Sequence, residues 1–335
     1  MRSKFCLGLA LICLLGAVAP SWALEFCGVD ANAGHFKSGF EAGEVPGIAE
    51  AILPADNTPL TLVIDGPPAA AMISTANAEV FGSFTAPPNT GITVNDIAAY
   101  HSGNQWLVQV PLQAGSNTLT VVLHALDGST QTLTRNVDRA ADPLAPEDVV
   151  VPNRSDIAAF HARFSINVTN LAQLSADFDG DGNIDLIDSA PSGSVNFVYR
   201  QPGRYRAEFT LTPNIGAPST VARYLLAEHP SEVRQTLCHV FGVMRSKLIA
   251  NDIPGALTAL VTELRPGFQD FWTGVGAAEL PTLAANLGTI VDGRFSPDQA
   301  ELILARPDPD NPGQAFAFRV QFARNEDGIW RITAM

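Results

Sequence analysis

The residues whose chemistry is most specific lie between Asp177 and Asp188, where five aspartates fall within twelve positions. Calcium takes six to eight oxygen ligands, and a common twelve-residue loop supplies them from positions 1, 3, 5, 7, 9 and 12. Counted from the first aspartate, those positions hold Asp177, Asp179, Asp181, Asn183, Asp185 and Asp188. We therefore predict a Ca²⁺ site made of these six residues, with Asn183 binding through its backbone carbonyl.

Three further features of the loop bear on this prediction. Gly182 stands at position 6, where a positive φ is needed, and Ile184 at position 8 is expected to be an apolar anchor. Asp188 replaces the usual glutamate at position 12, and its shorter side chain puts binding through two oxygens in doubt. Carboxylates about 5 Å apart repel by roughly 1 kcal/mol in water, which a divalent cation reverses. The alternative is a solvated Asp/Gly turn without an ion.

The segments after the loop indicate strands. Ser194–Tyr199 and Arg204–Leu211 are two β-type runs joined by Gln-Pro-Gly, so the loop joins strands rather than the helices of an EF-hand. An Asp-rich turn followed by Tyr199 and by Pro202-Gly-Arg-Tyr205 resembles a PKD-like (polycystic kidney disease) domain, over roughly Pro143–Ile215. The resemblance implies a β-sandwich that carries the calcium loop.

The N-terminus has the pattern of a secretory signal. Arg2 and Lys4 precede the apolar run Phe5–Ala19, and Ser21-Trp-Ala23 is a small-x-small cleavage site. An uncleaved N-terminal anchor is the alternative. No other apolar run reaches membrane-spanning length. We expect a protein that is secreted, periplasmic or at the cell surface, with no integral membrane span after cleavage.

The net charge restricts the kinds of partner that the protein can bind, and the cysteine content restricts the disulfides that it can form. The net charge is −14, and without Arg2 and Lys4 it becomes −16, from 18 basic and 34 acidic residues. Nucleic acids and anionic membranes need basic patches, so the expected partner is an unknown protein or polysaccharide. The cleaved chain keeps Cys27 and Cys238, which can pair in an oxidising compartment. Two separate thiols are the slightly favoured alternative.

Thr58–Val137 is a series of short strands with turn signals every eight to twelve residues, as in a β-sandwich. The predicted strands are Leu60–Ile64, Val80–Thr85, Gly91–Asn95, Gln105–Val110, Thr118–His124 and Thr130–Thr134. The phrase from Thr90 through Trp106 to Asp127-Gly128 resembles bacterial Ig-like domains of the glucodextranase-B type, which implies a spacer or recognition module. Trp106 and Tyr100 form either part of the core, the favoured reading, or a sugar-stacking face.

From about Val221 the apolar spacing becomes helical, and strands return near the C-terminus. One helix carries Val233, Leu237, Phe241, Met244 and Leu248. Asp252 is expected to cap a second helix, and Glu279–Leu287 indicates a third. The later strands are Gln299–Ala305, Phe316–Phe322 and Ile329–Ile332. This order, with Leu248–Leu257 and the terminal Asp327–Ile332, resembles the cone-shaped fold of nuclear transport factor 2 and ketosteroid isomerase.

Catalytic signatures are missing from the sequence. There is no Gly-x-Ser-x-Gly, His-Glu-x-x-His, phosphate-binding loop or dinucleotide fingerprint. The cone resemblance implies a buried aspartate base, for which Asp252 and Asp270 are the candidates. A helix cap and an exposed helix residue explain these two better, so we expect no enzyme.

The predicted fold class is multi-domain: two all-β Ig-like sandwiches followed by a small α+β domain. The predicted divisions are a signal peptide (1–23), a lead-in (24–55), an Ig-like sandwich (56–140), a PKD-like sandwich (141–216) and an α+β cone-like domain (217–335). We expect an exported, calcium-stabilised, non-catalytic binding or spacer protein of the adhesion type. The alternative is an exported small-molecule carrier or isomerase-like enzyme that uses the cone.

Overall fold

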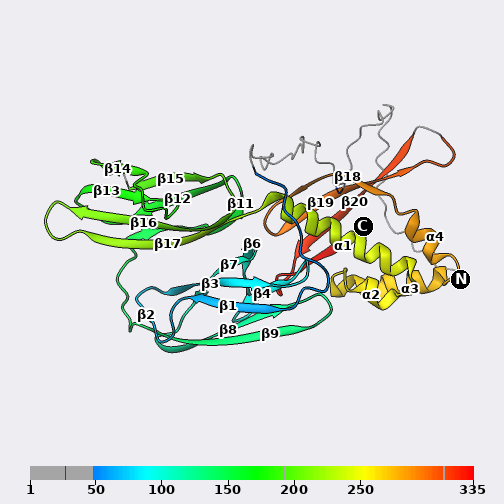
Figure 1. Cartoon of the computed structure of the whole chain (residues 1–335), viewed down its shortest axis with the longest axis horizontal. Helices are drawn as coiled ribbons and strands as arrows, with labels where there is room; N and C mark the ends of the chain where they lie inside the picture. The colour runs from blue at the N-terminus through cyan, green and yellow to red at the C-terminus, as the bar shows by residue number, and fades with distance from the viewer. Residues whose placement is uncertain (1–26, 28–47, 192, 312–313) are drawn as a thin grey trace, which may run out of the picture.

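The computed structural model describes residue 27 and residues 48–191, 193–311 and 314–335. The predicted signal peptide and most of the lead-in lie outside these residues. The described chain is mostly β-structure in five sheets, with helices only in its C-terminal third (Figure 1). Its buried apolar residues form three clusters. We call the surrounding regions the first sandwich (residues 61–139), the second sandwich (149–228) and the helix–sheet unit (230–334).

The first sandwich packs sheet β1-β3-β7-β6 on sheet β2-β9-β8-β4-β5. Its strands are β1 (Thr61–Gly66), β2 (Met72–Ile73), β3 (Asn77–Thr85), β4 (Gly91–Val94), β5 (Ile97–Ala98), β6 (Tyr100–Ser102), β7 (Gln105–Pro111), β8 (Gly115–His124) and β9 (Thr130–Arg139). All six predicted strands are present. Trp106 is fully buried in the core, so the sugar-stacking alternative is wrong for this residue.

The second sandwich packs sheet β10-β12-β15 on sheet β11-β17-β16-β13-β14. Its strands are β10 (Val149–Val150), β11 (Ser155–Ile157), β12 (Phe160–Ile166), β13 (Leu171–Asp177), β14 (Leu186–Asp188), β15 (Ser194–Tyr199), β16 (Gly203–Pro213) and β17 (Ser219–Glu228). β13 and β14 pair as antiparallel neighbours on either side of the Asp-rich loop. The loop therefore joins strands, as predicted.

The helical spacing predicted from Val221 onward begins later. Residues of β17 pair with β16 from Ser219 to Ala227, and the first helix starts at Pro230. Because β17 contains Val221 and an apolar Tyr-Leu-Leu run that favours strands, it extends the second sandwich. The predicted boundary between residues 216 and 217 falls in the β16–β17 hairpin instead of between domains.

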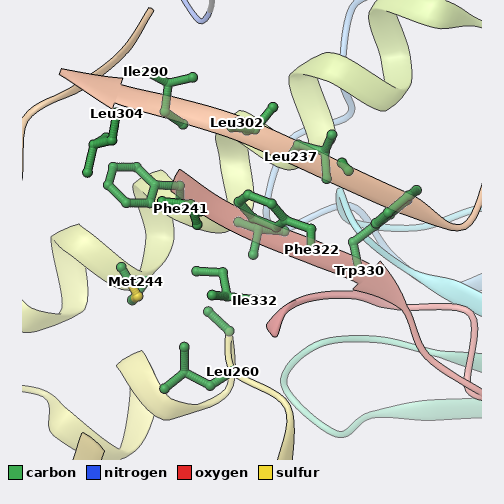
Figure 2. Packing of buried hydrophobic residues seen from close by; sticks show 14 of the residues in the cluster. Leu237, Phe241, Met244, Leu260, Ile290, Leu302, Leu304, Phe322, Trp330 and Ile332 are labelled. Carbon is green, nitrogen blue, oxygen red and sulfur yellow. The ribbon is translucent and has the colours of Figure 1, made fainter. Parts of the chain in front are cut away.

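The helix–sheet unit lays helices on one face of the meander β18-β19-β20-β21. Its elements are α1 (Pro230–Ile249), α2 (Ile253–Leu257), α3 (Arg265–Val275), α4 (Leu280–Ala285), β18 (Thr289–Phe295), β19 (Gln299–Pro307), β20 (Ala315–Arg324) and β21 (Trp330–Ala334). The predicted stripe of α1 is buried throughout. Leu237, Phe241 and Met244 belong to the same buried cluster as Leu302 and Phe322 of the sheet (Figure 2).

The first sandwich is fixed to both other regions by polar contacts. Arg204 of β16 pairs with Asp65 (3.1 Å), and Arg154 pairs with Glu79 (2.5 Å), which links the two sandwiches. On the other side, Asn89 exchanges two hydrogen bonds with the backbone of Trp330, at 3.0 and 2.9 Å. These contacts join segments that lie far apart in the sequence.

The described part of the lead-in runs beside α1. Ala51 donates its amide to Ser231 (2.8 Å) and accepts from the side chain of Gln235 (2.6 Å). A disulfide joins Cys27 to Cys238 on the same helix. The alternative of two separate thiols is therefore wrong, and the N-terminal segment is covalently tied to the helix–sheet unit.

Candidate functional site

The Asp-rich loop between β13 and β14 brings three of the predicted ligands together. Carboxylate oxygens of Asp177, Asp179 and Asp185 lie within 4.8 Å of one another. Asp177 is the last residue of β13 and is buried, whereas Asp179 and Asp185 are exposed. The cluster therefore faces solvent but has a buried base.

Backbone amides of the loop hold these carboxylates in place. Asp177 accepts from the amides of Gly180 (2.7 Å) and Gly182 (2.8 Å), and Asp185 accepts from Phe178 (2.7 Å). Gly182 has a φ of +89°, as its position in the loop predicted. Partial desolvation by the loop, and then the charges of the neighbouring aspartates, raise the pKa of the exposed Asp179, although the amide of Asp181 acts in the opposite direction. The loop thus fixes the acidic groups at an electrostatic cost.

The other predicted ligands point to local partners. Asp181 accepts from the amide and the side chain of Asn183 (2.7 and 2.9 Å), which lowers the pKa of Asp181. Asp188, the last residue of the edge strand β14, accepts from the amide of Ala190 (2.8 Å). A ligand role for Asp181, Asn183 and Asp188 stays a prediction. Ile184 is 54% exposed, so its predicted role as an apolar anchor is wrong: β14 offers no helix core for it to enter.

The geometry of the three-aspartate cluster fits calcium. Calcium–oxygen distances of about 2.3–2.6 Å place ligands on opposite sides of the ion at most about 5 Å apart. Separations within 4.8 Å meet that limit. Each carboxylate oxygen can accept more than one contact, so the amide bonds to Asp177 leave capacity for a cation. The remaining ligands would be waters or further loop oxygens.

The helix–sheet unit places neither catalytic candidate as a buried base. Asp252 caps α2 by accepting from the amide of Gly255 (2.9 Å), pairs with Lys247 (3.0 Å), and is 40% exposed. Asp270 is exposed on α3. The face of the sheet toward α1 is filled by core side chains, among them Phe322 and Leu302 (Figure 2).

A buried charged joint, which sequence reasoning missed, lies where the three regions meet. Glu228 at the end of β17 pairs with Arg324 of β20 at 2.6 Å, with side-chain exposures of 1% and 3%. The guanidinium of Arg324 lies over the rings of Tyr100 (5.0 Å) and Trp330 (5.1 Å). The only signal in the sequence was a glutamate directly after the apolar run of β17.

Two more contacts from the first sandwich complete the joint. Glu232 of α1 accepts from the amide of Gly103 (2.7 Å) and lies 3.4 Å from His101. The hydroxyl of Tyr100 donates to Asp298 (3.0 Å), so Tyr100 belongs to the joint and not to a sugar-binding face. Burial first, and then Asp298, raise the pKa of Tyr100.

Comparisons with known proteins show how far similarity extends. No family model matches the chain, and no curated protein matches it in sequence. Among solved structures, fibronectin(III)-like modules of Clostridium thermocellum CbhA share 12% identity over 50% of this chain and 95% of that one, with a TM-score of 0.20. The S-layer protein SbsC, domains 5–6, shares 12% identity over 51% and 99%, with a TM-score of 0.25.

A third similar structure is SGBP-B of Bacteroides ovatus, in complex with a mixed-linkage heptasaccharide. It shares 16% identity over 51% of this chain and 47% of that one, with a TM-score of 0.18. The sheets of the chain itself show the β-sandwich architecture. Within the described residues, no helix combines the length and apolar character needed to cross a membrane.

Proposed function

We propose that this chain is an exported, non-catalytic modular protein that binds or spaces other molecules, with calcium stabilising its second sandwich. The observation that carries the calcium part is the cluster of Asp177, Asp179 and Asp185 on a loop between strands. At the finer level, the first sandwich is a glucodextranase-B-type Ig-like module, the second is PKD-like, and the helix–sheet unit is a cone related to nuclear transport factor 2. Its partner is a protein or polysaccharide outside the cytoplasm.

The packing of the helix–sheet unit favours this role over the carrier or isomerase alternative. A cone that holds a substrate needs a concave face lined by a few polar groups. Here the side chains of α1 and of the sheet fill that face, and the two aspartate candidates lie outside it. Binding of an apolar small molecule by the intact protein would instead favour the alternative.

Calcium binding can be tested by thermal unfolding of the full chain with calcium and with a chelator. We expect a dissociation constant on the order of 10⁻⁴ M. A free calcium concentration about a hundred times that constant stabilises the folded sandwich by about 2.7 kcal/mol. Asp179→Asn should abolish the shift, because it removes a charge while keeping an oxygen for the Asp181 amide. The matched control is Asp270→Asn on α3, which should leave the shift unchanged. Equal melting temperatures in calcium and chelator would reject the calcium part of the proposal.

A further inference from the structure

A groove of about 890 Å³ lies between the second sandwich and the helix–sheet unit. One wall is made by β11, the start of β12 and the short link between them, and it includes Asp156 of β11 and His161 of β12. The lining also includes Glu301 of β19 and Gln321 of β20, whose chain neighbours are buried in the core. Because successive strand residues point to opposite faces, these two side chains lie on the face turned away from the helices.

The two sides of the groove are held together by buried contacts. Ile157, which lines the wall, belongs to the hydrophobic core of the helix–sheet unit. The next residue, Ala158, donates its amide to the carbonyl of Glu228 (3.0 Å), whose side chain pairs with Arg324. The groove is therefore formed before any ligand arrives, and its volume falls within the ~300–1,000 Å³ of typical ligand sites.

The groove has a lining of mixed polarity, and its exposed uncharged polar side chains include Gln299 and Gln321. Neither of these two side-chain amides makes a hydrogen bond among the described residues. Each amide offers two donors and an acceptor, and the Thr333 hydroxyl adds one of each kind. The two phenylalanines of the lining, Phe295 and Phe322, are buried in the core and offer no anchor.

The two carboxylates of the groove have local partners. Glu301 lies 3.4 Å from Arg294 on β18 and 3.7 Å from Arg319 on β20. Asp156 accepts from the amide of Ile157 (2.8 Å). A polyanion finds no cluster of uncompensated cations here, and a peptide finds none of the open apolar pockets that anchor peptide side chains.

We propose that this groove binds a neutral, hydroxyl-rich ligand, namely a stretch of a few units of an uncharged polysaccharide. Vicinal hydroxyls both donate and accept, which matches the paired donors and acceptors of Gln299 and Gln321. This inference rests on the binding role proposed above and adds the ligand class and the place where it binds. Because the described lining of the groove holds no Tyr, no Trp and no exposed Phe for stacking, binding is weak, with a dissociation constant on the order of 1 mM.

The test is calorimetric titration of the full chain with neutral hexasaccharides of β-glucan, xylan and mannan. We expect at least one to bind, and the double variant Gln299→Ala/Gln321→Ala to bind it about tenfold more weakly or worse. The control Gln269→Ala, an exposed glutamine on α3, should bind as the parent does. A calcium melting shift retained in the double variant shows that the fold and the loop are intact, so failure at the groove is separate from failure of the calcium proposal.

Three results would overturn the groove proposal. The first is no binding of any of the three neutral hexasaccharides at about ten times the expected dissociation constant. The second is binding that Gln299→Ala/Gln321→Ala leaves unchanged, which places the sugar elsewhere. The third is tighter binding of hexagalacturonate than of every neutral probe, which makes the ligand an anion.

Discussion

Glu228 and Asp177 are both buried carboxylates, with exposures of 1% and 8%, yet their charges meet different surroundings. Glu228 has a cation from its own chain, Arg324, at 2.6 Å. Asp177 has two backbone amides and, within 4.8 Å, two more carboxylates. Arg206, whose backbone lies beside the loop, is paired with Glu208. One acid is compensated internally, and the other is crowded by like charges.

The difference indicates what each acid is for. A buried ion pair adds little net stability compared with apolar residues, but it penalises any arrangement that separates the partners. Glu228 and Arg324 therefore specify how the regions meet. The carboxylates of the loop repel one another, and a cation taken from the solvent replaces this repulsion with attraction. This is the physical reason for proposing calcium at the loop.

The largest expected effect comes from breaking the internal pair. Arg324→Met should destabilise the protein by about 3–5 kcal/mol, because it leaves Glu228 buried without its cation. Chemical denaturation measures the loss. The double variant Glu228→Gln/Arg324→Met should recover a large part of it, since no buried charge remains. If the double variant is as unstable as Arg324→Met, the lost contribution is packing of Arg324 on Tyr100 and Trp330, and the comparison fails.

The two acids also differ in how well the sequence predicts them. The loop ligands lie within twelve residues, so their regular spacing was visible without a structure. Glu228 and Arg324 lie 96 positions apart, and only the folded chain brings them together. The groove is missed for the same reason, because its two sides come from different regions.

The helices and strands likewise divide into those that the sequence predicted and those that it did not. The long α1 and the alternating strands were predicted because one period dominates each of them. The extent of α3 was not predicted, although Asp270 was expected to be an exposed helix residue, because Pro266, Gly267 and Gly274 are poor helix formers and Trp272 is the only residue of α3 that is buried. β17 was missed because the helical spacing was predicted to begin at its apolar residues, although Pro230 just after it marks the start of a helix.

A smaller effect distinguishes the three aspartates that lie together in the structure from the other ligands that the spacing predicted. Asp185→Asn should remove the calcium shift of about 2.7 kcal/mol, whereas Asp181→Asn and Asp188→Asn should keep most of it. The reason is that only Asp185 shares the cluster with Asp177 and Asp179. Thermal unfolding at matched calcium concentrations gives the measurement. An equal loss in all three variants would mean that calcium closes the loop around the full set.

Asp252 is an exposed carboxylate, in contrast to the buried Glu228 and Asp177, and the smallest effect is expected from changing it. The amide of Gly255, followed by Lys247, holds the pKa of its carboxyl below the usual value. A carboxyl whose pKa is lowered by folding contributes stability above its unfolded pKa of about 3.9 and loses it as the pH falls through the folded pKa. Asp252→Asn keeps a cap acceptor but removes the charge, and Asp252→Ala removes both.

At pH 7 the melting temperature should therefore fall slightly in Asp252→Asn and further in Asp252→Ala. As the pH drops below about 3.9, the difference between the parent and Asp252→Asn should close, because the parent loses the same charge. The difference between Asp252→Asn and Asp252→Ala should persist, since the amide oxygen does not titrate. The melting temperatures of the parent and of Asp252→Asn could instead differ by the same amount across this pH range. That result would show that the charge of this exposed cap contributes nothing to stability, and that only the buried acids depend on their partners.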